Sequence, residues 1–279
     1  MLVFPCAKVN LGLNVVTRRS DGYHDLETVF YPIPLCDTLE VIVKEDADTE
    51  ITPCDLTVTG MTLDGASEDN LVVKAYRLLA KDYPLPPISV RLHKAIPSQA
   101  GLGGGSSDAA YMLLVLNEMF DLHIDVAPLT KYAAQIGADC AFFIQSSPAY
   151  ATGIGDVLTP LADEQIPLNG RYMVLVKPQV AVSTREAYSR IQPKKPVMNC
   201  AEVVRMPLET WRKNLKNDFE DSVFPLYPEI RQIKEQLYEE GAVYALMSGS
   251  GSAVFGIFNE EPEISNDRFS DCELFTMAL

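Results

Sequence analysis

The segment from Gly101 to Asp108 constrains the fold of this chain more than any other, because four of its first five residues are glycine. Glycine adopts positive φ angles without strain and lets another group approach the backbone closely. A strongly apolar stretch, residues 109–120, follows and predicts a buried helix. The unpaired N–H groups of a helix's first turn, together with the helix dipole, favour an anion such as phosphate in a turn of this kind.

Two interpretations of this turn stay open from its residues alone. The chain lacks the G-x-x-x-x-G-K-[ST] spacing of a Walker A loop and the spacing of a dinucleotide-binding fold. A short glycine-rich turn can also be no more than a tight connection between two elements. Ser106 or Ser107 could cap the helix, donate to a phosphate or bind Mg²⁺.

Strand and helix patterns together predict an α+β protein with antiparallel hairpins. Alternation through residues 9–15 predicts a half-buried strand with Lys8 and Asn10 on one face, opposite the core. Further strands are expected over residues 28–33, 38–43, 89–94, 172–176, 242–247, 253–258 and 273–278. Helices are expected over residues 70–83 with Asn70 as a possible N-cap, 127–136, 183–191 with a capping box from Ser183 to Glu186, and 228–240.

The length of the chain bounds its domain organisation. The 279 residues suffice for two packed domains, and we expect residues 1–155 to form the N-terminal domain and residues 156–279 the C-terminal domain. The polar segment 259–271 contains Pro262, so we expect no full helix there.

Composition restricts the possible partners. A net charge of -15 opposes a nucleic-acid surface, which needs a basic patch. The chain has neither a signal-peptide pattern at its start nor an apolar run of about 20 residues, so we expect a cytoplasmic protein without membrane contact. The six cysteines show no metal-site or disulfide spacing, and we expect each to be a small buried apolar residue. A monomer is the default expectation for the oligomeric state.

Three motifs in chain order resemble those of the GHMP kinases. The string from Pro97 to Ala110 has the family pattern P-x-x-x-G-L-G-G-G-S-S-D-A-A, and the others are residues 7–11 (Ala-Lys-Val-Asn-Leu) and residues 248–255 (Ser-Gly-Ser-Gly-Ser-Ala-Val-Phe). The resemblance covers essentially the whole chain. It implies the GHMP kinase fold, with an N-terminal ribosomal-S5-like domain and a C-terminal ferredoxin-like domain.

Two further segments narrow the resemblance to family members that act on a cytidine-diphosphate-linked polyol. They are residues 21–28 (Asp-Gly-Tyr-His-Asp-Leu-Glu-Thr) and residues 137–143 (Gly-Ala-Asp-Cys-Ala-Phe-Phe). The implied activity is ATP-dependent phosphorylation of the 2-hydroxyl of 4-diphosphocytidyl-2-C-methyl-D-erythritol, a step of the non-mevalonate route to isoprenoid precursors, with ATP and Mg²⁺ as cofactors. The alternatives are another GHMP kinase, acting on homoserine, mevalonate or a sugar, and a non-catalytic ligand-binding protein of this fold.

The resemblance also implies roles for single residues. Asp139 would be the catalytic base and Lys8 its partner, although by themselves they could be a turn residue and a solvated lysine. No metal-ligand residue is assigned. Asn10, Tyr23, His24 and Tyr188 would bind the substrate, with Tyr188 stacking on the cytosine face opposite the Tyr23–His24 pair. The implied ATP-binding residues are Asn70, Lys94, Pro97, Ser98, Gln99, Ala100, Gly101, Leu102, Gly103, Gly104, Gly105, Ser106 and Ser107.

Overall fold

The computed structural model describes residues 1–44, 53–61 and 67–279. It shows an α+β chain that divides into two compact units, each built from separate segments. The first unit comprises residues 1–7, 35–98 and 103–146, and the second comprises residues 8–34, 99–102 and 147–279. The chain therefore passes between the units inside the glycine-rich segment, after Leu102.

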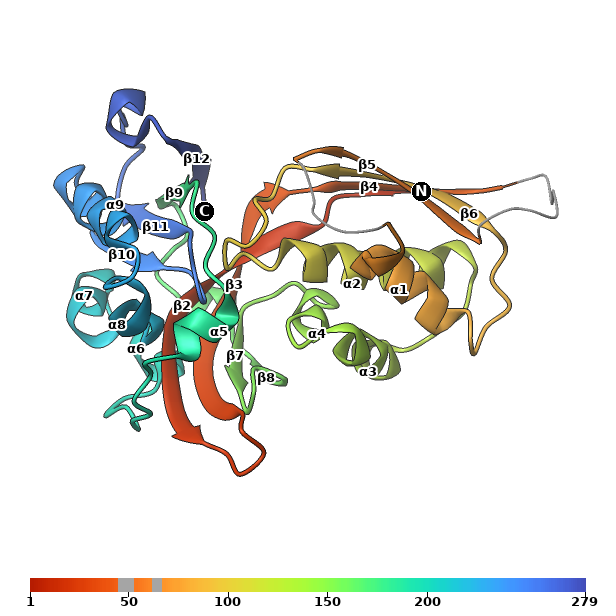
Figure 1. Ribbon diagram of the computed structural model, residues 1–279, viewed down its shortest axis with the longest axis horizontal. Coiled ribbons are helices and arrows are strands. Elements are labelled where there is room, and N and C mark those ends of the chain that lie inside the picture. Colours follow the sequence, from red (N-terminus) through yellow and green to blue (C-terminus); the bar gives the residue numbers. More distant parts are fainter. Residues whose placement is uncertain (45–52, 62–66) are drawn as a thin grey trace. The chain divides into compact units, whose positions relative to one another are not determined.

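The first unit contains a mixed four-stranded sheet in the order β1-β4-β6-β5. β4 (Thr38–Val43) pairs antiparallel with β1 (Leu2–Val3) and β6 (Ile88–Lys94), and β5 (Cys54–Gly60) runs parallel to β6. Alternate residues of β4 and β6 are buried, as a sheet covered on one face requires. Figure 1 shows the helices on that one side: α1 (Leu71–Leu79), α2 (Gly104–Met119), α3 (Val126–Ile136) and α4 (Cys140–Phe143).

The second unit contains two antiparallel sheets. The first has the order β2-β3-β7-β8 and the second the order β10-β11-β9-β12. The strands of the first are β2 (Cys6–Arg18), β3 (His24–Cys36), β7 (Ala149–Thr152) and β8 (Val157–Pro160), and those of the second are β9 (Tyr172–Pro178), β10 (Tyr244–Met247), β11 (Val254–Phe258) and β12 (Cys272–Ala278). The helices of this unit are α5 (Thr184–Tyr188), α6 (Cys200–Val203), α7 (Trp211–Asn214), α8 (Phe219–Val223) and α9 (Pro228–Glu239).

Strand β2 is buried on both of its faces, which corrects the prediction of a half-buried strand. Its residues Leu13 and Val15 pack in one core with apolar side chains of the β9–β12 sheet and of α8 and α9. Residues 216–218 lie alongside it, since Leu13 N–H donates to the Lys216 carbonyl and its own carbonyl accepts from Asp218 N–H, both at 2.8 Å. Polar side chains on the other face of β2 must therefore have protein partners.

Most predicted helices and strands are confirmed, and the predicted caps at two helix starts are present. Asn70 caps α1 by accepting from Val72 N–H at 2.9 Å, and Ser183 with Glu186 forms the capping box of α5. Helices α1 and α5 end earlier than predicted, at Leu79 and Tyr188. The polar segment 259–271 contains only a short 3₁₀ turn over residues 266–269, as expected.

The start of α2 differs from the prediction. This helix begins at Gly104 rather than near residue 109, and its N-cap is Gly103, whose φ is +72°. Ser106 and Ser107 consequently lie inside the first turns, so the interpretation of either serine as the helix cap is wrong. The glycines are thus part of the helix start itself.

Three predictions about the whole chain have different outcomes. Within residues 1–44, 53–61 and 67–279, no helix is long and apolar enough to cross a membrane. Cys54, Cys140 and Cys200 are buried as expected, but Cys6, Cys36 and Cys272 are only half-buried. The division at residue 155 stays a prediction; that residue lies in the turn between β7 and β8, within the second unit.

Candidate active site

The beginning of α2 forms an anion-binding geometry in the first unit. Gly103 takes a left-handed conformation and its carbonyl accepts the first helical hydrogen bond, from Ser107 N–H at 2.9 Å. A Cβ on Gly104 would lie 2.9 Å from the Ile96 Cγ2 atom, so this position has no room for a side chain. The N–H groups of the first turn have no carbonyl partners within an α-helix and can bind phosphate oxygens.

Asp139 lies next to this helix start in the same unit. It precedes α4, after α3 has ended at Gly137, and is half-buried. Ser106 of α2 faces residues on both sides of it. A Cβ on Gly137 would be 4.0 Å from Ser106 Oγ, and the Ser106 hydroxyl lowers the pKa of the Cys140 thiol, which burial raises to about 11. The candidate base and the candidate phosphate site are therefore neighbours.

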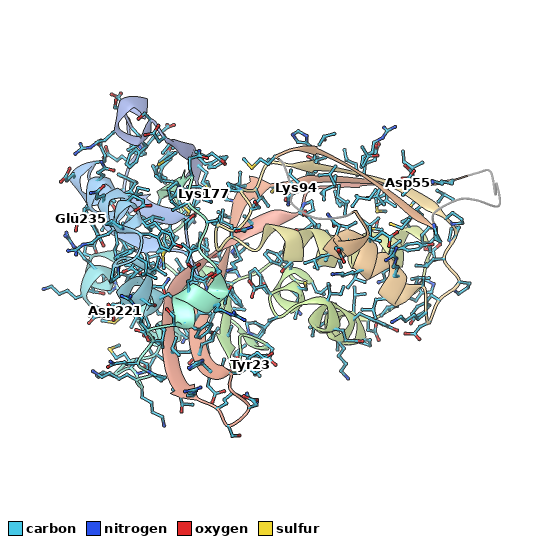
Figure 2. The ribbon with its side chains drawn as sticks, in the orientation of Figure 1. Tyr23, Asp55, Lys94, Lys177, Asp221 and Glu235 are labelled. Atoms are coloured by element: carbon cyan, nitrogen blue, oxygen red, sulfur yellow. The ribbon has the colours of Figure 1, made fainter. Side chains whose placement is uncertain are left out.

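Lys94 is buried and paired with two acids in the first unit. Its side chain is 3% exposed, and its ammonium forms ion pairs with Asp37 and with Asp108 Oδ2, the latter at 2.6 Å. Figure 2 shows Lys94 between the sheet and the helices of the first unit. The predicted role of Lys94 in ATP binding stays a prediction, and with the ammonium so paired any contact with ATP would have to come from the Lys94 backbone. Asn70 likewise uses its side-chain oxygen as the cap of α1.

Lys8 binds the first part of the glycine-rich segment in the second unit. Its Nζ donates to the Gly101 carbonyl at 2.9 Å and to Asn10 Oδ1 at 2.7 Å, and its N–H donates to the Leu102 carbonyl at 2.9 Å. Lys8 is 3% exposed, and its Nζ also lies 5.1 Å from the centroid of the Phe30 ring. The expected common face of Lys8 and Asn10 is confirmed, whereas the picture of a solvated lysine is wrong.

The serine- and glycine-rich loop after β10 supports the same segment. Ser248 Oγ donates to the Gly101 carbonyl at 2.9 Å and accepts from Asn10 N–H at 3.3 Å. A Cβ on Gly101, whose φ is +76°, would lie 2.0 Å from the Ser248 carbonyl oxygen. Asn217 Nδ2 donates to the carbonyls of Met247 and Gly249, at 2.8 and 2.7 Å, and so fixes this loop.

Sequence reasoning missed Thr28, Ser248 and Asn217 as functional supports. Thr28 Oγ1 accepts from Asn10 Nδ2 at 2.9 Å and donates to the Gly12 carbonyl at 2.5 Å, which fixes the Asn10 amide. Thr28 and Ser248 belong to quoted motifs, so the motifs marked their positions without giving their roles. Asn217 lies outside these motifs, and its hydrogen bonds hold the loop after β10.

The predicted cytosine-binding residues lie near the turn between β2 and β3. Tyr23 is 64% exposed, and its N–H donates to Asp21 Oδ1 at 3.0 Å, so the Asp21–Gly22 turn is also present (Figure 2). The rings of His24 and Tyr188 stack on each other, with centroids 4.9 Å apart and planes at 17°. Two stacking contacts of about 3.5 Å each would need rings about 7 Å apart. A base therefore reaches this face of Tyr188 only if the His24 ring moves away.

Comparison with known proteins adds an independent finding to this geometry. Residues 70–147 match the family model described as GHMP kinases N terminal domain, and residues 201–268 match GHMP kinases C terminal. A protein of Bacteroides fragilis (strain YCH46) called 4-diphosphocytidyl-2-C-methyl-D-erythritol kinase is 51% identical over 279 residues, which is 100% of both chains.

The chain belongs to the GHMP kinases. A second relative with the same name, from Parabacteroides distasonis, is 48% identical over 100% of both chains. A crystal structure of 4-(cytidine 5'-diphospho)-2C-methyl-D-erythritol kinase is 30% identical, with a TM-score of 0.78 over 100% of this chain and 99% of the other. A mevalonate kinase structure, 12% identical with a TM-score of 0.68, shares the fold. GHMP kinases use ATP as phosphate donor, and this chain is therefore a kinase that acts on a small molecule.

Proposed function

We propose that this GHMP kinase transfers the γ-phosphate of ATP to the 2-hydroxyl of 4-diphosphocytidyl-2-C-methyl-D-erythritol, in the formation of isoprenoid precursors. The names of the full-length relatives support this acceptor. The observation that carries the proposal is the position of Ser106, in the first turn of α2, beside Gly137 and Cys140, which lie on either side of Asp139. It brings a carboxylate beside a phosphate-binding helix start.

Asp139 is the base in this proposal. It accepts the proton of the acceptor hydroxyl while that oxygen attacks the γ-phosphorus of ATP and ADP leaves. Phosphoryl transfer depends mainly on position and electrostatics. Its place at the start of α4 fixes the backbone from which the carboxylate projects.

Lys8 acts as the partner of Asp139 in the proposal. An ammonium keeps a neighbouring carboxylate ionised and offsets the negative charge that develops on the transferred phosphoryl group. The bonds from Lys8 to the Gly101 carbonyl and to Asn10 support an ordered ammonium at the glycine-rich segment. Asn10, held in turn by Thr28, would donate or accept at the acceptor polyol.

The cytidine half of the acceptor is assigned to Tyr23, His24 and Tyr188. An exposed tyrosine ring can stack on a pyrimidine, and an imidazole can form hydrogen bonds with its edge. The stack of His24 on Tyr188 supports an aromatic site at this end of the second unit. Cytosine would replace the His24 ring on Tyr188, with Tyr23 on its other face.

The residues at the helix start suit ATP and Mg²⁺. Gly103 takes a positive φ angle just before the first turn of α2, and the N–H groups of that turn have no carbonyl partners within the helix. Mg²⁺ commonly takes only one or two protein ligands and binds substrate phosphates. The hydroxyl of Ser106 or Ser107 would hold it; Ser107 Oγ is buried and has no hydrogen-bond partner within the described residues. Mg²⁺ bound there would supply charge neutralisation for the phosphates.

The test is ADP release by the full chain with ATP and one acceptor at a time. The acceptors are 4-diphosphocytidyl-2-C-methyl-D-erythritol, mevalonate, homoserine and galactose. We expect turnover with the first alone, at a kcat/KM at least about a hundredfold above the others, because a site with buried polar groups rejects ligands that leave these groups unpaired. Turnover with only a non-nucleotide alcohol would show that the acceptor assignment is wrong.

A further inference from the structure

A buried cluster of one cation and two acids lies beneath the start of α2, within the first unit. Lys94, Asp37 and Asp108 are 3%, 0% and 2% exposed, and the ammonium pairs with both carboxylates. Burying charges is costly unless their mutual attraction and further hydrogen bonds compensate for the lost hydration. The chemistry proposed above does not require these three side chains to contact either substrate.

The cluster joins three segments that define the phosphate-binding geometry. Asp37 lies between β3 and β4, and its Oδ1 accepts from the N–H groups of Ala95 and Ile96, at 2.6 and 2.8 Å. Lys94 is the last residue of β6, and Asp108 lies in the second turn of α2. The ion pairs therefore connect the end of β6 and the residues after it to α2.

Gly104, the first residue of α2, packs directly against two residues that the cluster holds. A Cβ there would lie 2.9 Å from Ile96 Cγ2 and 3.4 Å from Lys94 Nζ. Both atoms belong to residues that the cluster holds, Ile96 by its N–H and Lys94 by its ammonium. Movement of the cluster would thus move the surface against which the first turn of α2 packs.

The two acids differ in their hydrogen bonds. Asp37 accepts from the ammonium and from two backbone N–H groups, as an ionised carboxylate does well. Asp108 accepts through Oδ2 alone, and its Oδ1 is buried without a partner within the described residues. Burial raises the pKa of Asp108 to about 7, with Asp37 adding to the rise and Lys94 opposing it. A proton on Asp108 leaves the cluster neutral, as Lys94⁺ with Asp37⁻.

We propose that Asp37, Lys94 and Asp108 are positioning residues for ATP, which set the first turn of α2 and its phosphate-binding N–H groups without touching the nucleotide through their side chains. Asp37 carries the negative charge that pairs with the ammonium, and Asp108 adds one acceptor through Oδ2. The proposal rests on the proposed function, since it takes the start of α2 to be the ATP phosphate site. Lys94 then affects ATP affinity because its ammonium holds the two acids together.

The test compares Asp37→Asn, Lys94→Met and Asp108→Asn in the full chain. ATP binding by titration calorimetry and the KM values of both substrates from ADP release are measured, with circular dichroism as a check of folding. Asp37→Asn and Lys94→Met should raise the Kd and KM of ATP at least about tenfold, the loss expected for one charge-assisted hydrogen bond, and change the acceptor KM less than about threefold. Asp108→Asn should raise the Kd and KM of ATP less than Asp37→Asn does, because an amide keeps the Oδ2 acceptor.

The double variant Asp37→Asn/Lys94→Met covers the case in which a single variant fails to fold, since it leaves no unpaired charge. It too should bind ATP at least about tenfold more weakly. Wild-type ATP affinity in a folded Asp37→Asn, Lys94→Met or double variant overturns the proposal, and so does an equal rise in both KM values. Equal damage from Asp108→Asn and Asp37→Asn overturns the assignment of charge. Because calorimetry needs no turnover, a wild-type chain that binds ATP but phosphorylates none of the acceptors would refute the proposed function and leave this test intact.

Discussion

Replacing Gly101 with alanine should destabilise the second unit and the site together. At a φ of +76° an alanine costs about 1–2 kcal/mol in backbone strain. Its Cβ would lie 2.0 Å from the Ser248 carbonyl oxygen, over an ångström closer than ordinary van der Waals contact. Because that obstacle is backbone, the overpacking adds about 1–3 kcal/mol. The expected loss in the free energy of unfolding is therefore about 2–5 kcal/mol.

Gly170→Ala is the matched control, because Gly170 has a φ of +75° and a Cβ there would meet nothing within 4 Å. It should cost only the strain of about 1–2 kcal/mol. The assays are urea unfolding of both variants and their rates of ADP release. Gly101→Ala should also lower kcat/KM at least about tenfold. The Gly101 carbonyl, once displaced, loses its hydrogen bonds from Lys8 Nζ and Ser248 Oγ. Equal stability of the two variants, or wild-type kcat/KM in Gly101→Ala, would refute this reasoning.

Three more predictions follow from the site. Asp139→Asn should lower kcat at least about a hundredfold, the lower end of what general-base catalysis contributes, and leave the calorimetric Kd of ATP within about threefold; near-normal turnover would exclude Asp139 as the base. Tyr23→Ala should raise the acceptor KM about tenfold, from one lost stacking contact, with the ATP KM unchanged; equal shifts in both would contradict a role in cytosine binding. Because the folded pKa of Asp108 is about 7, against an ordinary 3.8, its contribution to stability is full below about pH 4 and is lost as pH rises through 7. Relative to wild type, Asp108→Asn should thus be more stable at pH 8 than at pH 5 by urea unfolding, and no difference between the two pH values would contradict a buried, proton-binding Asp108.

Local sequence rules predicted the elements that local interactions determine. The cap at Asn70 and the capping box at Ser183 depend on residues two or three positions away, and both are present. The start of α2 escaped prediction because glycine has low helix propensity. Tertiary packing decides at Gly104, where Ile96 leaves no space for any larger residue.

The candidate site was predictable only where a motif marks a position. Its supporting contacts join residues far apart in the chain, such as Asn10 with Ser248, so no local pattern contains them. Lys94 illustrates the limit most clearly. The family resemblance implied an ATP contact for Lys94, but its partners Asp37 and Asp108 come from two other segments, and its side chain is buried. Charge pairing of this kind depends on the fold, and the sequence around Lys94 gives no sign of it.

The measurement that tests the central claim most directly is phosphate transfer from γ-labelled ATP to two acceptors that differ only in the cytidylate. One is 4-diphosphocytidyl-2-C-methyl-D-erythritol, and the other is the same polyol 4-phosphate without it. If the kinase selects its acceptor by the linked nucleotide, kcat/KM should be at least about a hundredfold higher for the first acceptor. Base stacking alone is worth about 1–3 kcal/mol, and hydrogen bonds add to it. Equal kcat/KM for both acceptors would contradict a kinase that binds its acceptor through the cytosine.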